Sequence, residues 1–154
     1  MSGGEVTEVY FYHLELRTLE EVLPTLLQRS GEKGWRAAVQ ATSEERIEAL
    51  DSLLWSFSEE GFLPHGTARD GNASAHPIYL TVEGDNPNGA QVRFLLDGAT
   101  LDDASSYERV VFIFDGRDAD AVARARAQWQ AALESGHAVS YWQQDADGRW
   151  QQKA

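Results

Sequence analysis

Apolar runs that alternate with capped helical segments restrict the fold of this sequence more than any other feature. Val92–Leu96 and Val110–Phe114 read as continuous apolar strands, a pattern typical of central strands covered on both faces. Asp118 is expected to cap a long helix over Ala119–Ser135, which Gly136 closes. This alternation predicts an α/β fold with a mostly parallel, doubly wound sheet flanked by helices.

The other predicted elements complete a single domain over residues 1–154. Two more helices are expected, one capped by Thr18 and the other by Thr42 or Ser43. The region after the second helix reads as an ordered loop with a short extended piece around Phe62 and Leu63. The remaining strands are predicted at Val6–Leu14, Trp35–Ala41, Ile78–Val82 and, flanking a hairpin turn that gives an antiparallel edge, Ala138–Gln144 and Arg149–Gln152.

Composition restricts the class of protein further. Hydrophobic residues make up 42% of the chain, enough to pack a core. Cysteine is missing, which excludes disulfides and cysteine-ligated metals and fits a cytoplasmic setting. No apolar run reaches the roughly 18 residues of a membrane helix, and the N-terminus lacks the pattern of a signal peptide. We therefore expect a cytoplasmic protein without a membrane partner.

The charge of the chain bears on its partners. A formal net charge of −12 should repel nucleic acid at long range, so any link to DNA is expected to pass through another protein. Local basic residues can still form an anion site on such a surface. The net charge sets the field at a distance, and it does not decide the chemistry of one pocket.

The signatures of nucleotide and catalytic sites are missing from the sequence. The turn after the first strand, Glu15–Thr18, contains no glycine, and no GxxxxGK[ST] loop occurs. We therefore expect a Rossmann-like fold without a nucleotide-binding loop. The histidines are scattered, and no GxSxG elbow surrounds a serine. The sequence predicts no catalytic residue, no metal site and no cofactor.

One enzymatic constellation remains as an alternative. Asp97 and Asp115 each follow an apolar run directly, so both carboxylates are expected at the carboxyl ends of strands. Two such carboxylates could hold Mg²⁺ for phosphoryl transfer. Each is followed by a glycine, however, and Asp-Gly is also an ordinary turn pair.

Two segments carry a resemblance to a known family. In Leu53–His65 a helix ends near Trp55, and Phe62 followed by Pro-His comes after six intervening residues. In Tyr107–Trp129 a strand leads into a helix that carries an arginine and a tryptophan. The order of the elements up to Gly136 matches as well. The chain resembles the chi subunit of the bacterial DNA polymerase III holoenzyme over nearly its whole length.

The resemblance implies a function in DNA replication. Members are non-catalytic accessory subunits associated with the clamp loader, and they bind the acidic, Phe-terminated C-terminal tail of single-stranded-DNA-binding protein. Many also bind a small psi subunit that ties them to the clamp loader. Whether a psi subunit or a direct contact makes that connection here is left open by the residues.

The resemblance also implies a pocket for the tail. Arg126 and Trp129 match its basic and aromatic positions, Trp55 and Phe62 match its other side, and Val122 stands where the family often has a lysine. A terminal Phe needs an apolar pocket, and its carboxylate needs a cation. Helical spacing alone favours a different role, in which the rings are core residues and the arginine reaches solvent. A peptide-binding module outside replication is the remaining alternative.

Overall fold

The computed structural model describes residues 6–57, 63–101 and 104–154. Those residues form a single sheet with three α-helices and two 3-10 turns. The elements in chain order are β1 (Glu8–Leu14), α1 (Leu19–Glu32), β2 (Ala37–Gln40), α2 (Glu44–Phe57), β3 (Gly66–Thr67), η2 (Ala68–Asp70), η3 (Ala73–Ala75), β4 (Ile78–Thr81), β5 (Val92–Leu96), β6 (Arg109–Asp115), α3 (Ala119–Glu134), β7 (Ala138–Gln144) and β8 (Trp150–Gln152).

The sheet has eight strands in the order β3-β4-β2-β5-β6-β1-β7-β8. All paired strands run parallel except β7 and β8, which form the antiparallel C-terminal edge. The prediction of a mostly parallel α/β fold is confirmed, and so is the antiparallel hairpin. The strands β5 and β6 lie in the middle of the sheet, as their apolar runs predicted.

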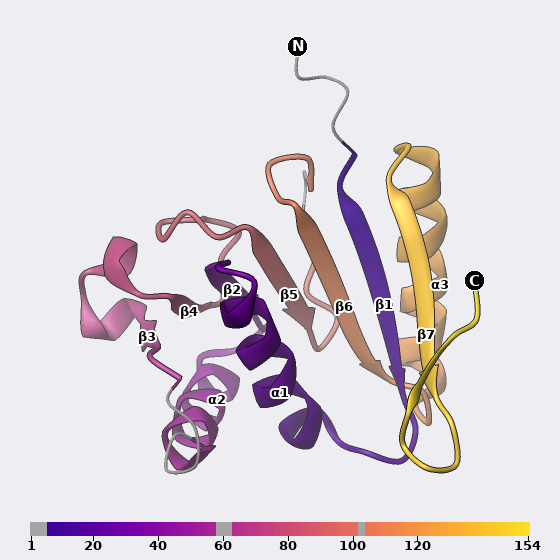
Figure 1. The fold of residues 1–154 in the computed structure, drawn as a ribbon, viewed down its shortest axis with the longest axis horizontal. Helices are drawn as coiled ribbons and strands as arrows, with labels where there is room; N and C mark the ends of the chain where they lie inside the picture. Colours follow the sequence, from indigo (N-terminus) through magenta and orange to yellow (C-terminus); the bar gives the residue numbers. More distant parts are fainter. Residues whose placement is uncertain (1–5, 58–62, 102–103) are drawn as a thin grey trace.

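Helices cover both faces of the sheet (Figure 1). The helices α1 and α2 pack on one face, where the largest apolar cluster lies, and α3 packs on the other, against β1, β6 and β7. Chain segments between the strands cover the rest of the second face, around Leu95 and Tyr107. The two faces therefore present different helices, and this separation decides which side chains can share a site.

Side-chain caps begin the helices as the sequence predicts. Thr18 and Glu21 form a reciprocal capping box at α1, and Ser43 Oγ accepts a hydrogen bond from the Arg46 N–H at α2. The carboxylate of Asp118 caps α3. The buried side chains of α3 are the small residues Ala121, Ala125 and Ala132, which allow the helix to approach the strands closely.

The expected extended piece around Phe62 and Leu63 falls partly outside the described residues, and a short strand that was not predicted follows it. Phe62 lies outside the described residues, Leu63 is not in a strand, and the short strand β3 comes later, at Gly66–Thr67. Close packing restricts the residue at the start of β3, because a Cβ at Gly66 would lie within 2.5 Å of the His76 ring. Only glycine allows the chain to pass that ring while it pairs with β4.

A buried arginine lies within β5, in a run that reads as apolar. The side chain of Arg93 is fully buried. Its guanidinium donates to Gln40 Oε1 at 2.7 and 3.0 Å and to the Tyr107 hydroxyl at 3.0 Å. It also donates to the carbonyl oxygens of Glu83 and Asp85. One side chain thereby holds three segments that are far apart in sequence, and its partners are neutral acceptors rather than a carboxylate.

We predict that Arg93→Met destabilises the fold by about 3 kcal/mol. The substitution fills most of the volume but leaves the amide oxygen of Gln40 and two carbonyl groups without their buried donor. Urea unfolding followed by circular dichroism measures the change. The control is Arg69→Met, because Arg69 pairs with Glu48 at an exposed position and should cost less than about 0.5 kcal/mol. Equal effects of the two substitutions would show that the buried network is not stabilising.

Candidate functional site

Three of the predicted site residues share one flank of α3. Arg126 is exposed, while Val122 and Trp129 are partly buried on the side of the helix nearest β7. The Trp129 ring makes edge contacts with Phe11 at 5.6 Å and Tyr141 at 5.7 Å between ring centroids. The tryptophan is thus half core and half surface, next to an exposed guanidinium. This arrangement offers an aromatic surface and a cation side by side.

Tyr141 of β7 joins this flank and was not predicted from the sequence. Its ring lies against Trp129, and its hydroxyl is 2.6 Å from His13 Nδ1. Burial raises the pKa of Tyr141, and the nearby charge of Arg126 partly offsets that rise. The phenol therefore stays neutral near pH 7 and can donate or accept a hydrogen bond beside the guanidinium. In the predicted strand Ala138–Gln144, successive side chains point to opposite faces of the sheet. That alternation was the signal in the sequence that could have indicated the face on which Tyr141 lies.

His13 lies beneath Tyr141 and is enclosed by close packing. Its Nε2 is 3.2 Å from Glu15 Oε1, without the alignment of a hydrogen bond. A Cβ at Gly116 would lie 1.9 Å from that nitrogen and 2.8 Å from the Leu14 carbonyl oxygen. The absence of a side chain at Gly116 therefore makes the room that His13 occupies, and His13 in turn positions Tyr141.

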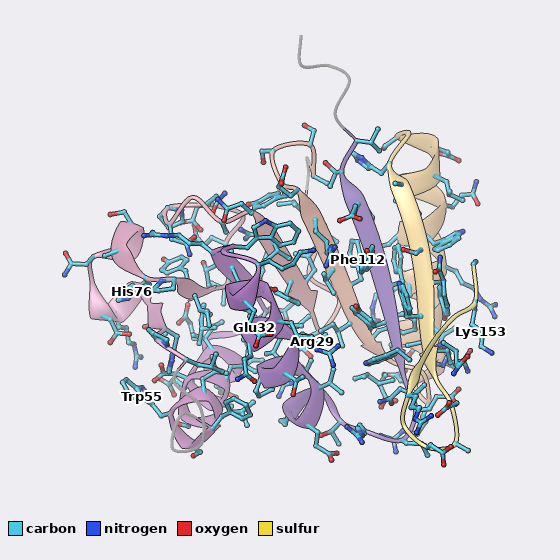
Figure 2. The ribbon with its side chains drawn as sticks, viewed as in Figure 1. Arg29, Glu32, Trp55, His76, Phe112 and Lys153 are labelled. Carbon is cyan, nitrogen blue, oxygen red and sulfur yellow. The ribbon has the colours of Figure 1, made fainter. Side chains whose placement is uncertain are left out.

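Trp55 does not lie near α3. It is on α2, on the opposite face of the sheet, and 62% of its surface is exposed. Its ring lies 4.9 Å from the ring of His65, and Figure 2 shows it at the end of the molecule away from β7. Phe62 lies outside the described residues. The structure therefore brings Val122, Arg126 and Trp129 together and places Trp55 apart from them.

Asp97 and Asp115 do line one cavity, of about 420 Å³, at the carboxyl ends of β5 and β6. Each is engaged by a guanidinium, since Asp97 is 3.0 Å from Arg46 and Asp115 is 3.2 Å from Arg117. The backbone N–H and the guanidinium of Arg117 hold the pKa of Asp115 below its usual value. Among residues 6–57, 63–101 and 104–154, no group of three or more histidine or acidic side chains is arranged to hold a metal ion. The geometry gives the magnesium alternative no support.

The same cavity faces the first turns of α1 and α3, where a phosphate would lie in a nucleotide-binding relative of this fold. Both turns are already capped. Thr18 accepts from the Glu21 N–H, and the Asp118 carboxylate accepts from the N–H groups of Asp120 and Ala121. A carboxylate at the helix start occupies the donors that a phosphate would need. Side-chain caps thus occupy the positions at which a nucleotide-binding protein of this fold has its glycine-rich loop.

The comparisons with known proteins agree on one family. The sequence matches the family described as DNA polymerase III chi subunit, HolC, over residues 6–140. A curated protein of Rickettsia prowazekii (strain Madrid E), named "Probable DNA polymerase III subunit chi", is 28% identical over 85 residues. That match covers 55% of this chain and 52% of the relative. The chain therefore spans about half the length of the curated relative that it matches.

We predict that Gly116→Ala destabilises the fold by about 1 to 3 kcal/mol, the usual cost of overpacking. The added methyl group must displace His13 or the backbone of Leu14. Chemical unfolding measures the loss, and the near-ultraviolet circular dichroism of Tyr141 and Trp129 should change as well. Gly31→Ala in α1 is the matched control, because nothing lies within 4 Å of its Cβ, and it should be neutral or stabilising. A Gly116→Ala protein as stable as the unmutated chain would contradict this packing.

Proposed function

The chain belongs to the family of DNA polymerase III chi subunits, and on that premise we propose that it is a non-catalytic adaptor. It binds the acidic C-terminal tail of single-stranded-DNA-binding protein and couples that protein to the clamp-loader part of the replicase. The observation that carries the proposal is the exposed Arg126 beside the half-buried Trp129 and Tyr141 on α3 and β7. Replication takes place in the bacterial cytoplasm, so we propose that compartment for the protein.

The chemistry of the tail fits this flank of α3. Its terminal phenylalanine needs an apolar surface, and the exposed sides of Trp129 and Val122 provide one. Its terminal carboxylate needs a charge-assisted partner, and Arg126 presents a guanidinium next to that surface. The Tyr141 hydroxyl, which shares a hydrogen bond with His13 Nδ1, adds a neutral polar group at the same place. Val122 offers no charge, so Arg126 carries the cationic contact on this flank.

An adaptor needs a second surface for its second partner. Trp55 is the most exposed large aromatic residue of the described chain, and it lies on the sheet face opposite α3. We therefore assign it to the surface that meets the clamp loader, through a psi subunit or directly, and no longer to the tail pocket. Two partners bound on opposite faces would not compete for space.

The non-catalytic part of the proposal rests on how the acidic side chains are used. Asp97, Asp115 and Asp118 each hold a guanidinium or cap a helix. None of them is paired with an activated nucleophile or a base in the described residues, as a hydrolytic or phosphoryl-transfer site would require. No helix in the described part of the chain combines the length and apolar content needed to cross a bilayer.

We predict that Arg126→Ala weakens binding of a tail peptide at least tenfold while the fold is retained. Arg126 is exposed in the free chain, but a bound peptide would partly bury it, and loss of a charge-assisted pair at such a site costs on the order of 2 kcal/mol or more. Fluorescence anisotropy with a labelled peptide ending in Asp-Phe measures the affinity. Arg124→Ala is the matched control, since it removes the same charge from the other flank of α3 and should leave the affinity almost unchanged. Equal losses in both variants would place the contact elsewhere on the helix.

The salt dependence of tail binding is expected to be moderate. Added salt weakens the short-range attraction at Arg126, and it also screens the repulsion between the acidic tail and a chain with a net charge of −12. These two effects oppose each other, so the affinity should fall less than for a binding site on a basic protein. The same anisotropy titration in increasing salt tests this, and a steep loss would show that several cations contact the tail.

A peptide-binding role outside replication predicts a different set of partners. Affinity purification of the tagged chain from cells should recover clamp-loader subunits if the adaptor role is correct. Recovery should decrease when Trp55 is replaced by alanine and should persist in Arg126→Ala. Loss of the clamp-loader subunits in Arg126→Ala alone would overturn the assignment of the two partners to opposite faces.

A further inference from the structure

A groove runs between α1 and the strands β6, β1 and β7, on the face of the sheet opposite α3. In front of β1 and β7 the described chain places no helix, so this part of the sheet is covered by its own side chains (Figure 1). Two cavities of about 390 and 230 Å³ form the groove, and both are lined by Leu26 and Arg29. Figure 2 shows Arg29 on the side of α1 that faces these strands.

The charges that line the groove are the reverse of those of the whole chain. The two cavities are lined by five basic residues and one acidic residue, Glu21. The chain as a whole has 13 basic and 25 acidic residues. Glu21 is engaged with Thr18 in the cap of α1. The basic residues along the groove are Arg17, Arg29, Lys33, Arg109 and Arg149.

Aromatic rings form the floor of the groove. Tyr12 lies 4.6 Å from Trp150 and 6.4 Å from Trp142, and Tyr10 lies 6.0 Å from Trp142, measured between ring centroids. All four rings are partly exposed. Because they come from three neighbouring strands, β1, β7 and β8, they form a continuous layer.

Cations and rings alternate along this layer. The Arg109 guanidinium lies 4.3 Å from the centroid of the Tyr10 ring and 5.0 Å from that of Trp35. Lys33 Nζ lies 4.4 Å from the centroid of the Trp35 ring. Burial raises the pKa of Tyr12, so its hydroxyl adds no negative charge near pH 7. Glu8 neutralises Arg109 at one edge, and the other four cations are exposed and have no ion pair in the described residues.

We propose that this groove binds single-stranded nucleic acid. Phosphates would lie along the cations in and next to α1 and in the β7–β8 turn, and bases would stack on the rings of β1 and β8. Aromatic rings next to a track of cations are what a single strand requires, because every base has a stacking face and every nucleotide carries one phosphate. The groove follows α1, whose 14 residues extend for about 20 Å at a rise of 1.5 Å per residue. A groove of that length accommodates a few nucleotides.

The net charge of the chain limits how this site acts. At a distance the strand meets an acidic protein, so association should be slow and the affinity low in free solution. The attraction appears only within about a Debye length, roughly 8 to 10 Å, of the groove. A weak site of this kind becomes effective when another contact already holds the protein close to a single strand. The inference does not require the tail site, which lies on the opposite face.

An acidic peptide is the other polyanion that such charges could attract. The rings favour nucleic acid, because bases stack on aromatic surfaces whereas carboxylate side chains do not. A short oligothymidylate separates the two occupants, since it carries phosphates and bases and no carboxylates.

The experiment is fluorescence anisotropy with a labelled oligothymidylate of about 12 nucleotides at low salt. Arg29→Glu combined with Lys33→Glu should weaken binding at least fivefold. The control, Arg69→Glu combined with Arg124→Glu, changes the net charge equally at positions outside the groove and should weaken binding less than twofold. Circular dichroism should show both proteins folded, since all four side chains are exposed.

Salt and stacking give two further measurements. The slope of log affinity against log salt should decrease by about 1.4 in the Arg29→Glu, Lys33→Glu protein, from about 0.7 for each lost phosphate contact. Trp150→Ala should weaken binding at least fivefold, while Trp150→Phe, which keeps a ring, should preserve it.

The proposal is overturned if the unmutated chain binds no oligothymidylate at low salt, or if the two charge-reversed proteins bind it equally. It is also overturned if Arg29→Glu with Lys33→Glu abolishes binding of the acidic tail peptide but leaves oligothymidylate binding unchanged, which would assign the groove to peptide. Failure of the proposed adaptor function appears separately, as tail binding that does not respond to Arg126→Ala.

Discussion

The parallel pairing of β1 with both β6 and β7 is the constraint on which the rest of the structure depends. The chain leaves β1 toward β2 on one side and leaves β6 toward β7 on the other. Right-handed crossovers in opposite directions place their helices on opposite faces, so α1 and α3 cannot lie on the same side. The separation of Trp55 from Arg126 follows from this, and so does the half-sheet that α1 leaves uncovered. The crevice between the two helix starts is the usual ligand position in such folds, but here capping side chains and ion pairs line it and occupy the N–H donors of the helix starts.

Much of the fold could be predicted because its determinants are local. The apolar runs, the caps at Thr18 and Asp118 and the C-terminal turn each act within a few residues, and the structure confirms the elements they predict. The buried side chain of Arg93 could not be predicted in this way. Its acceptors come from β2, from the segment after β4 and from Tyr107, which only the tertiary fold brings together. The short strand β3 at Gly66–Thr67 was not predicted for a related reason, because the close approach of Gly66 to the His76 ring is a tertiary contact.

The candidate site shows the same limit. Helical spacing correctly groups Val122, Arg126 and Trp129 on one flank of α3, because the period of a helix fixes which of its residues are neighbours. Spacing within one element cannot say which other element lies beside it. Tyr141 and His13 reach the site from β7 and β1, and their contact depends on the pairing of those strands. Trp55 was grouped with the pocket by resemblance alone, and its place on the other face follows from the handedness of the crossovers only once the strand order is known.

The distribution of charge connects the two proposed surfaces. A chain with a net charge of −12 repels both an acidic tail and a nucleic acid strand, yet each proposed ligand would meet cations close to aromatic rings. Short-range recognition combined with long-range repulsion disfavours loose, non-specific attachment, because only a ligand that reaches the ring surface gains the local attraction. If both proposals hold, occupation of one face would raise the effective concentration of the partner at the other, since the tail and the strand would belong to one protein–DNA complex. An acidic adaptor with two local cationic sites would therefore bind where the tail and the strand occur together, and would stay free where only one of them is present.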